Sequence, residues 1–271
     1  MKRGSLRCLP IALCALVTLA LTGAATAQGP HSPWVEGTLA FNRQDYPRAL
    51  TQFRLSAAQG DSRGQNYLGL MHRRGLGVPT DHAESAKWYG LSAAQGNSEG
   101  QFNLALAYEQ GWGVSKDIGE ALRLYRLAAQ QRHTEAQYVL GEIHDRGEVV
   151  ERDDVEALKW YRLAAAQDHV EAQMHLGMFY AQGRGGPADF PKAYDWLQRA
   201  AQQGNASAQR NLGVMYAVGM GGYPINLIAA YGLLGQAAEQ GDSGASKAFE
   251  LVVEMMTPAE LAEAKRTFAN D

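Results

Sequence analysis

The sequence predicts an all-α solenoid of stacked antiparallel helix pairs, and three observations support this prediction. A block of sequence recurs every 36 residues without slippage between residues 65 and 244, which hold five full units. Within each unit, apolar and small residues follow helical spacing. Glycine and aspartate recur at fixed places between the helical segments. A period of this size is typical of repeat proteins, in which each unit packs only against its neighbours.

The first half of each full unit predicts a helix with one core face. Its glutamines mark the period, at Gln65, Gln101, Gln137, Gln173 and Gln209. Its core leucines are Leu68, Leu104, Leu140, Leu176 and Leu212. A glycine or alanine follows each leucine, and small residues of this kind allow a neighbouring helix to approach closely.

The second half of each unit predicts another helix, which follows a glycine-rich turn. The glycines that should close the first helices in the left-handed conformation are Gly75, Gly111, Gly147, Gly183 and Gly219. The expected N-caps of the second helices are Asp45, Asp81, Asp117, Asp153 and Asp189. Three of them precede a glutamate by three residues, which predicts capping boxes with Glu84, Glu120 and Glu156. The last unit has Ile225 at the capping position, so we expect its second helix to begin loosely.

The two ends of the chain depart from the period. Residues 34–64 keep it only in their second half, which predicts an N-terminal helix pair with a tighter turn, after a flexible lead-in at 28–33. Residues 245–271 predict capping helices, the last of which begins with a capping box at Thr257 and Glu260.

Residues 1–27 predict a signal peptide. A basic start is followed by an apolar run at 11–21 and by the small-residue cleavage motif Ala25-Thr26-Ala27. We expect cleavage after Ala27 and a periplasmic or secreted mature protein. An uncleaved anchor is the alternative, although the apolar run is short for a bilayer span of about 20 residues.

Composition restricts the partner of the mature chain. Cleavage would remove three of the 25 basic residues and none of the 28 acidic ones, which leaves a net charge of −6. This charge argues against a nucleic-acid partner. Both cysteines, Cys8 and Cys14, lie in the signal segment, so packing rather than disulfides must stabilise the mature fold. We expect no integral membrane span after cleavage, no cofactor and no metal site.

The repeated columns resemble the Sel1-like repeat family, a relative of the tetratricopeptide repeat. The resemblance rests on the Leu-Gly pairs, the Gly-x-Gly-Val turns at 75–78 and 111–114, the aspartate caps and the Trp-Tyr pairs at 88–89 and 160–161. Residues 34–64 look more like a plain tetratricopeptide repeat. The family implies a right-handed superhelix that binds proteins or peptides on its concave side. It also implies a scaffold or regulatory role in envelope processes such as polysaccharide export, signalling, motility or host contact.

Three first-helix columns are not needed for the core and are the candidate partner-binding residues. Their spacing of i, i+4 and i+8 places them on a second stripe, which by similarity to tetratricopeptide repeats lines the concave groove. The first column is Asn66, Phe102, Tyr138, Met174 and Arg210. The second is Leu70, Leu106, Glu142, Met178 and Val214. The third is Arg74, Gln110, Arg146, Gln182 and Val218.

Several alternatives remain open. Phe102, Leu106 and Tyr138 could instead pack against the next unit. His169 and His175 have no third ligand nearby in sequence, and the glycines at 183–186 follow a helix rather than a strand, so neither motif predicts a metal or phosphate site. No catalytic constellation is evident, and we expect a non-enzymatic scaffold. A cell-wall hydrolase acting on peptidoglycan or β-lactams, or a glycan binder, is the alternative function.

Overall fold

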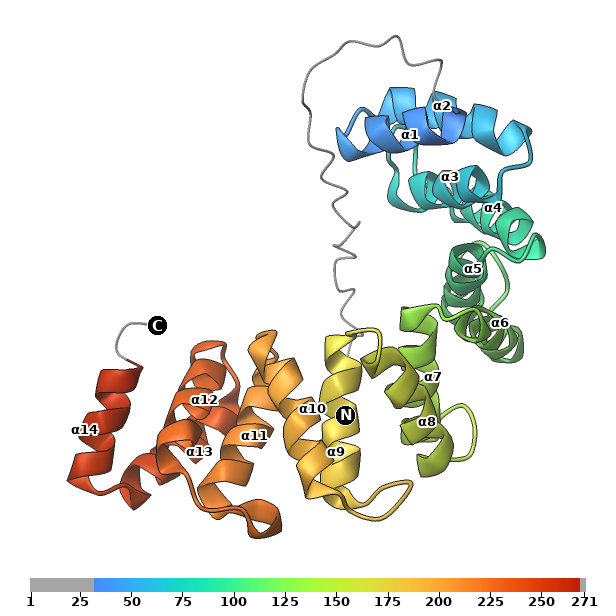
Figure 1. Cartoon of the computed structure of the whole chain (residues 1–271). Helices are drawn as coiled ribbons and strands as arrows, with labels where there is room; N and C mark the ends of the chain where they lie inside the picture. Colours follow the sequence, from blue (N-terminus) through green and yellow to red (C-terminus); the bar gives the residue numbers. More distant parts are fainter. Residues whose placement is uncertain (1–31, 269–271) are drawn as a thin grey trace. The chain divides into compact units, whose positions relative to one another are not determined.

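A computed structural model describes residues 32–268, which form fourteen α-helices and one short 3-10 helix (Figure 1). The helices are α1 (Pro33–Asn42), α2 (Tyr46–Ala58), α3 (Ser62–Arg74), α4 (His82–Ala94), α5 (Ser98–Gln110), α6 (Ile118–Gln130), α7 (Thr134–Arg146), α8 (Asp154–Ala165), α9 (Val170–Gln182), α10 (Phe190–Gln202), α11 (Ala206–Val218), η1 (Met220–Gly222), α12 (Leu227–Glu239), α13 (Ser243–Met255) and α14 (Pro258–Thr267). The predicted signal segment at 1–27 lies outside the described residues. Within 32–268, no helix combines the length and apolarity needed to cross a bilayer.

The helices pack as sequential pairs, which confirms the predicted all-α solenoid. Each helix from α2 to α12 contacts the helix before it and the helix after it, and α12 also packs against α14 (Figure 1). The first pair has the shorter connection: only 43–45 join α1 to α2, whereas 75–81 join α3 to α4.

The predicted helix boundaries depend on caps that the structure contains. Each of the five expected aspartates is the N-cap of a second helix; Asp81, for example, accepts a hydrogen bond from the backbone nitrogen of Glu84 at 2.9 Å. Gly75 ends α3 in the left-handed conformation at φ 67°, where a side chain would be strained. The capping box between Thr257 and Glu260 at the start of α14 is also confirmed.

Two predictions about caps were wrong. The side chains of Glu84, Glu120 and Glu156 do not complete capping boxes, because each pairs with a cation three residues further on. Glu120, for example, lies 2.7 Å from Arg123. In the last unit the turn is one residue longer, and Asn226 caps α12 instead of Ile225, accepting from the backbone nitrogen of Ala229 at 3.0 Å. That helix start is therefore capped like the others.

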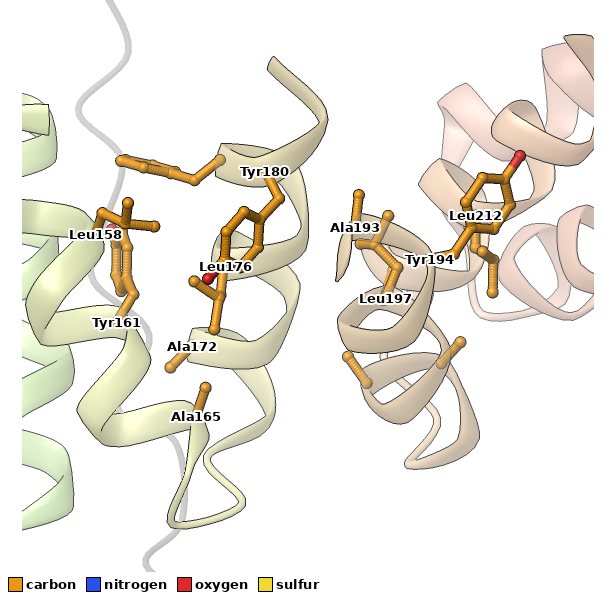
Figure 2. Packing of buried hydrophobic residues seen from close by; sticks show 14 of the residues in the cluster. Leu158, Tyr161, Ala165, Ala172, Leu176, Tyr180, Ala193, Tyr194, Leu197 and Leu212 are labelled. Atoms are coloured by element: carbon orange, nitrogen blue, oxygen red, sulfur yellow. The ribbon is translucent and has the colours of Figure 1, made fainter. Parts of the chain in front are cut away.

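The core lies between successive helices and alternates large with small side chains. Figure 2 shows Leu158 and Tyr161 of α8 facing Leu176 of α9, and Leu197 of α10 lies in the same cluster. A Cβ atom at Gly177 would approach Cγ of Leu197 to 2.6 Å, so the leucine–glycine pairs do permit the close packing that the sequence predicted.

The glutamines that mark the period are buried and connect helices. The side-chain amide of Gln167, in the turn that follows α8, donates to the side-chain oxygen of Gln137 in α7 at 2.8 Å. Gln137 in turn donates to the carbonyl of Ala129 in α6 at 3.0 Å. One glutamine thus bonds to the second helix of its own pair and to the preceding pair. Because an unpaired buried amide is costly, this network fixes the register of stacking.

Candidate partner-binding surface

The structure separates the three predicted columns into two kinds of surface. We call the first column the junction column: Asn66, Phe102, Tyr138, Met174 and Arg210. The ring of Phe102 is 6% exposed and stacks on the imidazole of His133 at 4.7 Å between centroids. Tyr138 stacks on His169 at 4.4 Å in the same way, one unit later. Each of these side chains therefore packs against the N-cap residue of the first helix in the next pair, in line with the packing alternative.

The other members of the junction column also contact the next unit or the core. The side-chain oxygen of Asn66 accepts from the amide of Asn103 in α5 at 3.0 Å. The guanidinium of Arg210 lies 2.9 Å from the carboxylate of Asp242, which caps α13. Met174 packs against the core cluster around α8 to α10. The junction column therefore contributes mainly to holding successive units together.

The two histidines of these junctions are N-caps, a role that sequence reasoning missed. Nδ1 of His133 accepts from the backbone nitrogen of Ala136 at 3.2 Å, and Nδ1 of His169 accepts from Ala172 at 3.1 Å. The equivalent caps of α3, α5, α11 and α13 are Asp61, Asn97, Asn205 and Asp242. The repeat alignment placed the histidines in this column and could have found the role. Histidine is simply uncommon among capping residues.

The second and third predicted columns remain reachable by solvent, and we call them the accessible stripe. The half-buried column is Leu70, Leu106, Glu142, Met178 and Val214. The exposed column is Arg74, Gln110, Arg146, Gln182 and Val218. Both columns recur on α3, α5, α7, α9 and α11, so the stripe runs through all five full units.

The stripe changes chemistry along the stack. Its middle is polar: Glu142 and Arg146 of α7 form an ion pair, and burial raises the pKa of the Glu142 carboxyl. The first unit contributes Arg74, which is exposed and carries a positive charge. After Glu142, its column continues with Met178 and Val214, and the exposed column ends in Val218, so the C-terminal end of the stripe is apolar.

The apolar end extends beyond the five full units, which the sequence reasoning did not predict. Leu251 and Met255 hold the same places in α13 as Val214 and Val218 hold in α11, counted from each helix's capping residue. Val218, Leu251 and Met255 are 56%, 60% and 54% exposed. The extra residue in the turn before α12 shifts the period by one, which hides this continuation in a strict 36-residue alignment.

A polar network lies beside the stripe where α7, α8 and α9 meet. The hydroxyl of Tyr161 donates to the carboxylate of Asp145 at 3.1 Å, and Arg184 donates to the other oxygen of that carboxylate at 2.6 Å. Arg184 also pairs with Asp154, and these bonds hold the pKa of Asp154 well below its usual range. Burial lowers the pKa of His175, which stacks on Tyr161 at 4.9 Å. Every charge in this network has a partner, which is typical of a structural rather than a catalytic cluster.

The residues that raised the question of a metal or phosphate site have structural roles. His169 caps α9 and His175 stacks on a tyrosine, so the two imidazoles do not act as a pair. Gly183 ends α9 in the left-handed conformation, and the turn that follows leads into α10. Among residues 32–268, no group of three or more His, Cys, Asp or Glu side chains is placed to bind a metal ion.

Comparison with known proteins identifies the repeat. Residues 62–97, 98–133, 134–169, 170–205 and 206–242 each match the model of the Sel1 repeat. A solved Sel1 repeat protein from Oxalobacter formigenes is 32% identical, with a TM-score of 0.73 over 81% of this chain and 87% of that chain. A protective antigen present in uropathogenic Escherichia coli strains, which displays an SLR fold, is 29% identical, with a TM-score of 0.60 over 88% of this chain and 60% of that chain. No curated protein matches this chain.

Proposed function

Because the chain belongs to the Sel1 repeat family, we propose that this scaffold protein binds a protein or peptide partner along the accessible stripe, in the groove formed by the first helices. The observation that carries the proposal is the apolar end of the stripe. Val218, Leu251 and Met255 come from two first helices and are each more than half exposed. Exposed apolar side chains grouped on one surface mark interaction sites more often than isolated ones do.

The contrast between the stripe and the junction column supports the same proposal. The junction column contacts the chain itself, so its side chains have partners already. Along the stripe, apolar, amide and charged side chains follow one another on successive helices and remain accessible. Such a surface suits an extended segment that crosses several units, because each unit then contributes a few contacts.

The place of action is also a proposal. The basic start, apolar run and small-residue motif of residues 1–27 favour export, cleavage after Ala27 and a role in the assembly or regulation of a bacterial envelope process. Mass spectrometry of the N-terminus of protein recovered from the cell envelope tests this. A mature protein that begins at Gln28 supports export, and an intact chain recovered from the cytoplasm contradicts it.

Partner binding is tested by placing a charge in the apolar end of the stripe. The variant carries Val218→Asp and Leu251→Asp, and the matched control carries Leu91→Asp and Leu163→Asp. The control leucines are 45% and 42% exposed and lie on the second helices α4 and α8. Both variants replace two exposed apolar side chains with aspartate, so they change the net charge equally.

The measurement is quantitative mass spectrometry of proteins retained by each immobilised variant from envelope extract. We expect the stripe variant to lose at least one protein that the wild type and the control retain. Circular dichroism checks that both variants keep their helices. Equal retention by the two variants would contradict binding along the stripe.

A further inference from the structure

Two equivalent positions in the six helix pairs hold side chains of matching chemistry, and one pair breaks the match. They are a second-helix position, in the column of Tyr89, and a first-helix position, in the column of Arg73. In the second full unit, the hydroxyl of Tyr125 donates to the carboxylate of Glu109 at 2.6 Å. In the third, Tyr161 donates to Asp145.

The remaining pairs are matched by apolar side chains. The fourth and fifth units have leucine with alanine at these two places, and in the N-terminal pair Phe41 and Phe53 lie 6.2 Å apart between centroids. Thus, where the second-helix position holds a tyrosine, the first-helix position holds a carboxylate. Where the second-helix position holds leucine or phenylalanine, the first-helix position is apolar. The first full unit follows neither pattern, because the residue at the position matched to Tyr89 is an arginine, Arg73.

Tyr89 lacks the acceptor that its counterparts have. The side chain is 1% exposed, and in the part of the chain that the structure describes its hydroxyl has no hydrogen-bond partner. The nearby hydroxyl of Ser85 donates to the carbonyl of Gly69 at 2.8 Å. Arg73 occupies the first-helix position from which Glu109 and Asp145 accept a hydrogen bond from the tyrosine hydroxyl in the next two units, and Arg74 follows it. Burial raises the pKa of Tyr89, and the positive charges of Arg73 and Arg74 act against this rise. An unsatisfied buried hydroxyl is costly, and a guanidinium offers only donors.

The two arginines also lack an anion. Among residues 32–268, neither Arg73 nor Arg74 lies within ion-pair distance of a carboxylate. Glu99 acts on Tyr89 from the next unit, but it pairs with His133 at 3.3 Å. The position equivalent to Glu142, which pairs with Arg146, is occupied by Leu70 in this unit. Among the described residues, the unit therefore brings a hydroxyl and two cations together without a carboxylate paired to any of them.

We infer that Arg73, Arg74 and the Tyr89 hydroxyl bind a carboxylate from an acidic side chain of the partner, at the place that Glu109 and Asp145 fill in the next two units. This assignment rests on the proposed function, since Arg74 belongs to the accessible stripe. The bound carboxylate accepts from the hydroxyl and from one or both guanidinium groups, as charge-assisted hydrogen bonds. The flexible Arg73 side chain moves to admit it.

The test uses small probes on the full chain and does not need the natural partner. Arginine and tyrosine signals are followed by NMR while N-acetylglutamic acid α-amide, whose carboxylate is on its side chain, is added. N-acetylglutamine amide is the neutral control, N-acetylalanine presents a terminal carboxylate, and inorganic phosphate presents a different anion. We expect the first probe to shift the Arg73, Arg74 and Tyr89 signals and the neutral probe to leave them unchanged.

Arg73→Glu places a glutamate in the first full unit at the position that Glu109 occupies in the second. We expect it to raise the thermal midpoint, because Tyr89 gains an acceptor, and to weaken probe binding about tenfold or more, because the site is then occupied from within. Arg54→Glu makes the same charge change on the exposed side of α2 and should leave binding within about twofold. Tyr89→Phe, which introduces the residue found at the equivalent place in the first pair, should keep the fold and weaken binding.

The possible results separate this site from the proposed function. Absence of any probe-induced shift, or a shift that persists in Arg73→Glu, would overturn the carboxylate site while leaving the retention experiment unaffected. Equal shifts with phosphate would overturn its specificity for carboxylate. Shifts with N-acetylalanine alone would overturn the assignment to an acidic side chain. Conversely, probe binding together with unchanged protein retention would contradict the stripe and preserve the carboxylate site.

Discussion

The junction column and the accessible stripe come from one helical spacing, yet they differ in what covers them. Phe102 and Tyr138 of the junction column each lie against the histidine that caps the next first helix, at centroid distances of 4.7 and 4.4 Å. Gln110 and Gln182 of the stripe lie about two turns after the junction-column residue of their own helix and remain exposed. The helical spacing thus determines which residues lie on the same face of a helix. Packing against the neighbouring helix pair determines which of those residues remain exposed to solvent.

The junction column is covered, and the stripe is not, because of the capping residue of the next first helix. This residue lies beside the junction column, where it can contact the preceding unit through an imidazole ring or a carboxylate. It does not reach the later turns that carry the stripe. The comparison therefore predicts large effects on stability at the junctions and effects on partner binding at the stripe.

The largest effect is expected for Phe102→Ala. Removal of this buried ring leaves a cavity between α5, α6 and α7. Such changes lower the free energy of unfolding by about 3–5 kcal/mol. Urea denaturation followed by circular dichroism measures the loss. A decrease below about 1 kcal/mol would show that the junction is not a packed contact.

The capping histidine gives a smaller effect with an internal control. His169→Ala removes the acceptor for the backbone nitrogen of Ala172, so we expect a loss of about 1 kcal/mol or more in the free energy of unfolding. His169→Asn supplies the acceptor used in the neighbouring unit at Asn205 and should recover part of the loss. Equal destabilisation by both substitutions would mean that stacking on Tyr138, and not the cap, is what matters.

The same junction should show a modest dependence on pH through His175. Burial lowers its pKa from the ordinary value of 6.5, so the unfolded chain binds this proton more readily than the folded chain does. The neutral ring's contribution to stability is complete above about pH 6.5 and is lost as the pH falls toward the lower folded pKa.

His175→Phe keeps a ring against Tyr161 and removes the titration. Thermal midpoints of wild type and variant, measured from about pH 7.5 to about pH 5, should show a shallower decline for the variant on acidification. Parallel curves would contradict the assigned role of burial. Asp145, 3.9 Å away, opposes the shift in His175.

The smallest effect on stability is expected at the stripe. Gln110→Ala and Gln182→Ala change exposed side chains, so the free energy of unfolding should stay within about 0.5 kcal/mol. The same denaturation assay used for Phe102→Ala checks this. A larger loss would mean that the stripe also holds units together.

Much of the fold followed from the sequence because its determinants are local and repeated. The aspartate caps, the turn glycines and the leucine–glycine pairs each act within one unit or between adjacent helices, and all occur where the period placed them. Competition between neighbours caused the errors: Glu84 pairs with Lys87 instead of reaching back to the cap.

The candidate surface was harder to predict, because exposure depends on the packed neighbours. Spacing alone grouped Phe102 with Gln110, although one is buried and the other exposed. The continuation to Leu251 and Met255 was hidden by one additional residue in a turn. The mismatch at Tyr89 became visible only when its counterparts could be seen donating to Glu109 and Asp145.

Site-specific photocrosslinking in the living cell tests the central claim most directly. A photoreactive residue is placed at Met178, Val214 or Leu251 of the extended stripe, or at the control positions Leu91 and Leu163 on second helices. Binding along the stripe predicts crosslinks from the three stripe positions to one protein, with neighbouring positions reaching neighbouring parts of its sequence. Crosslinks to that protein from the control positions alone, or equally from both sets, would contradict it.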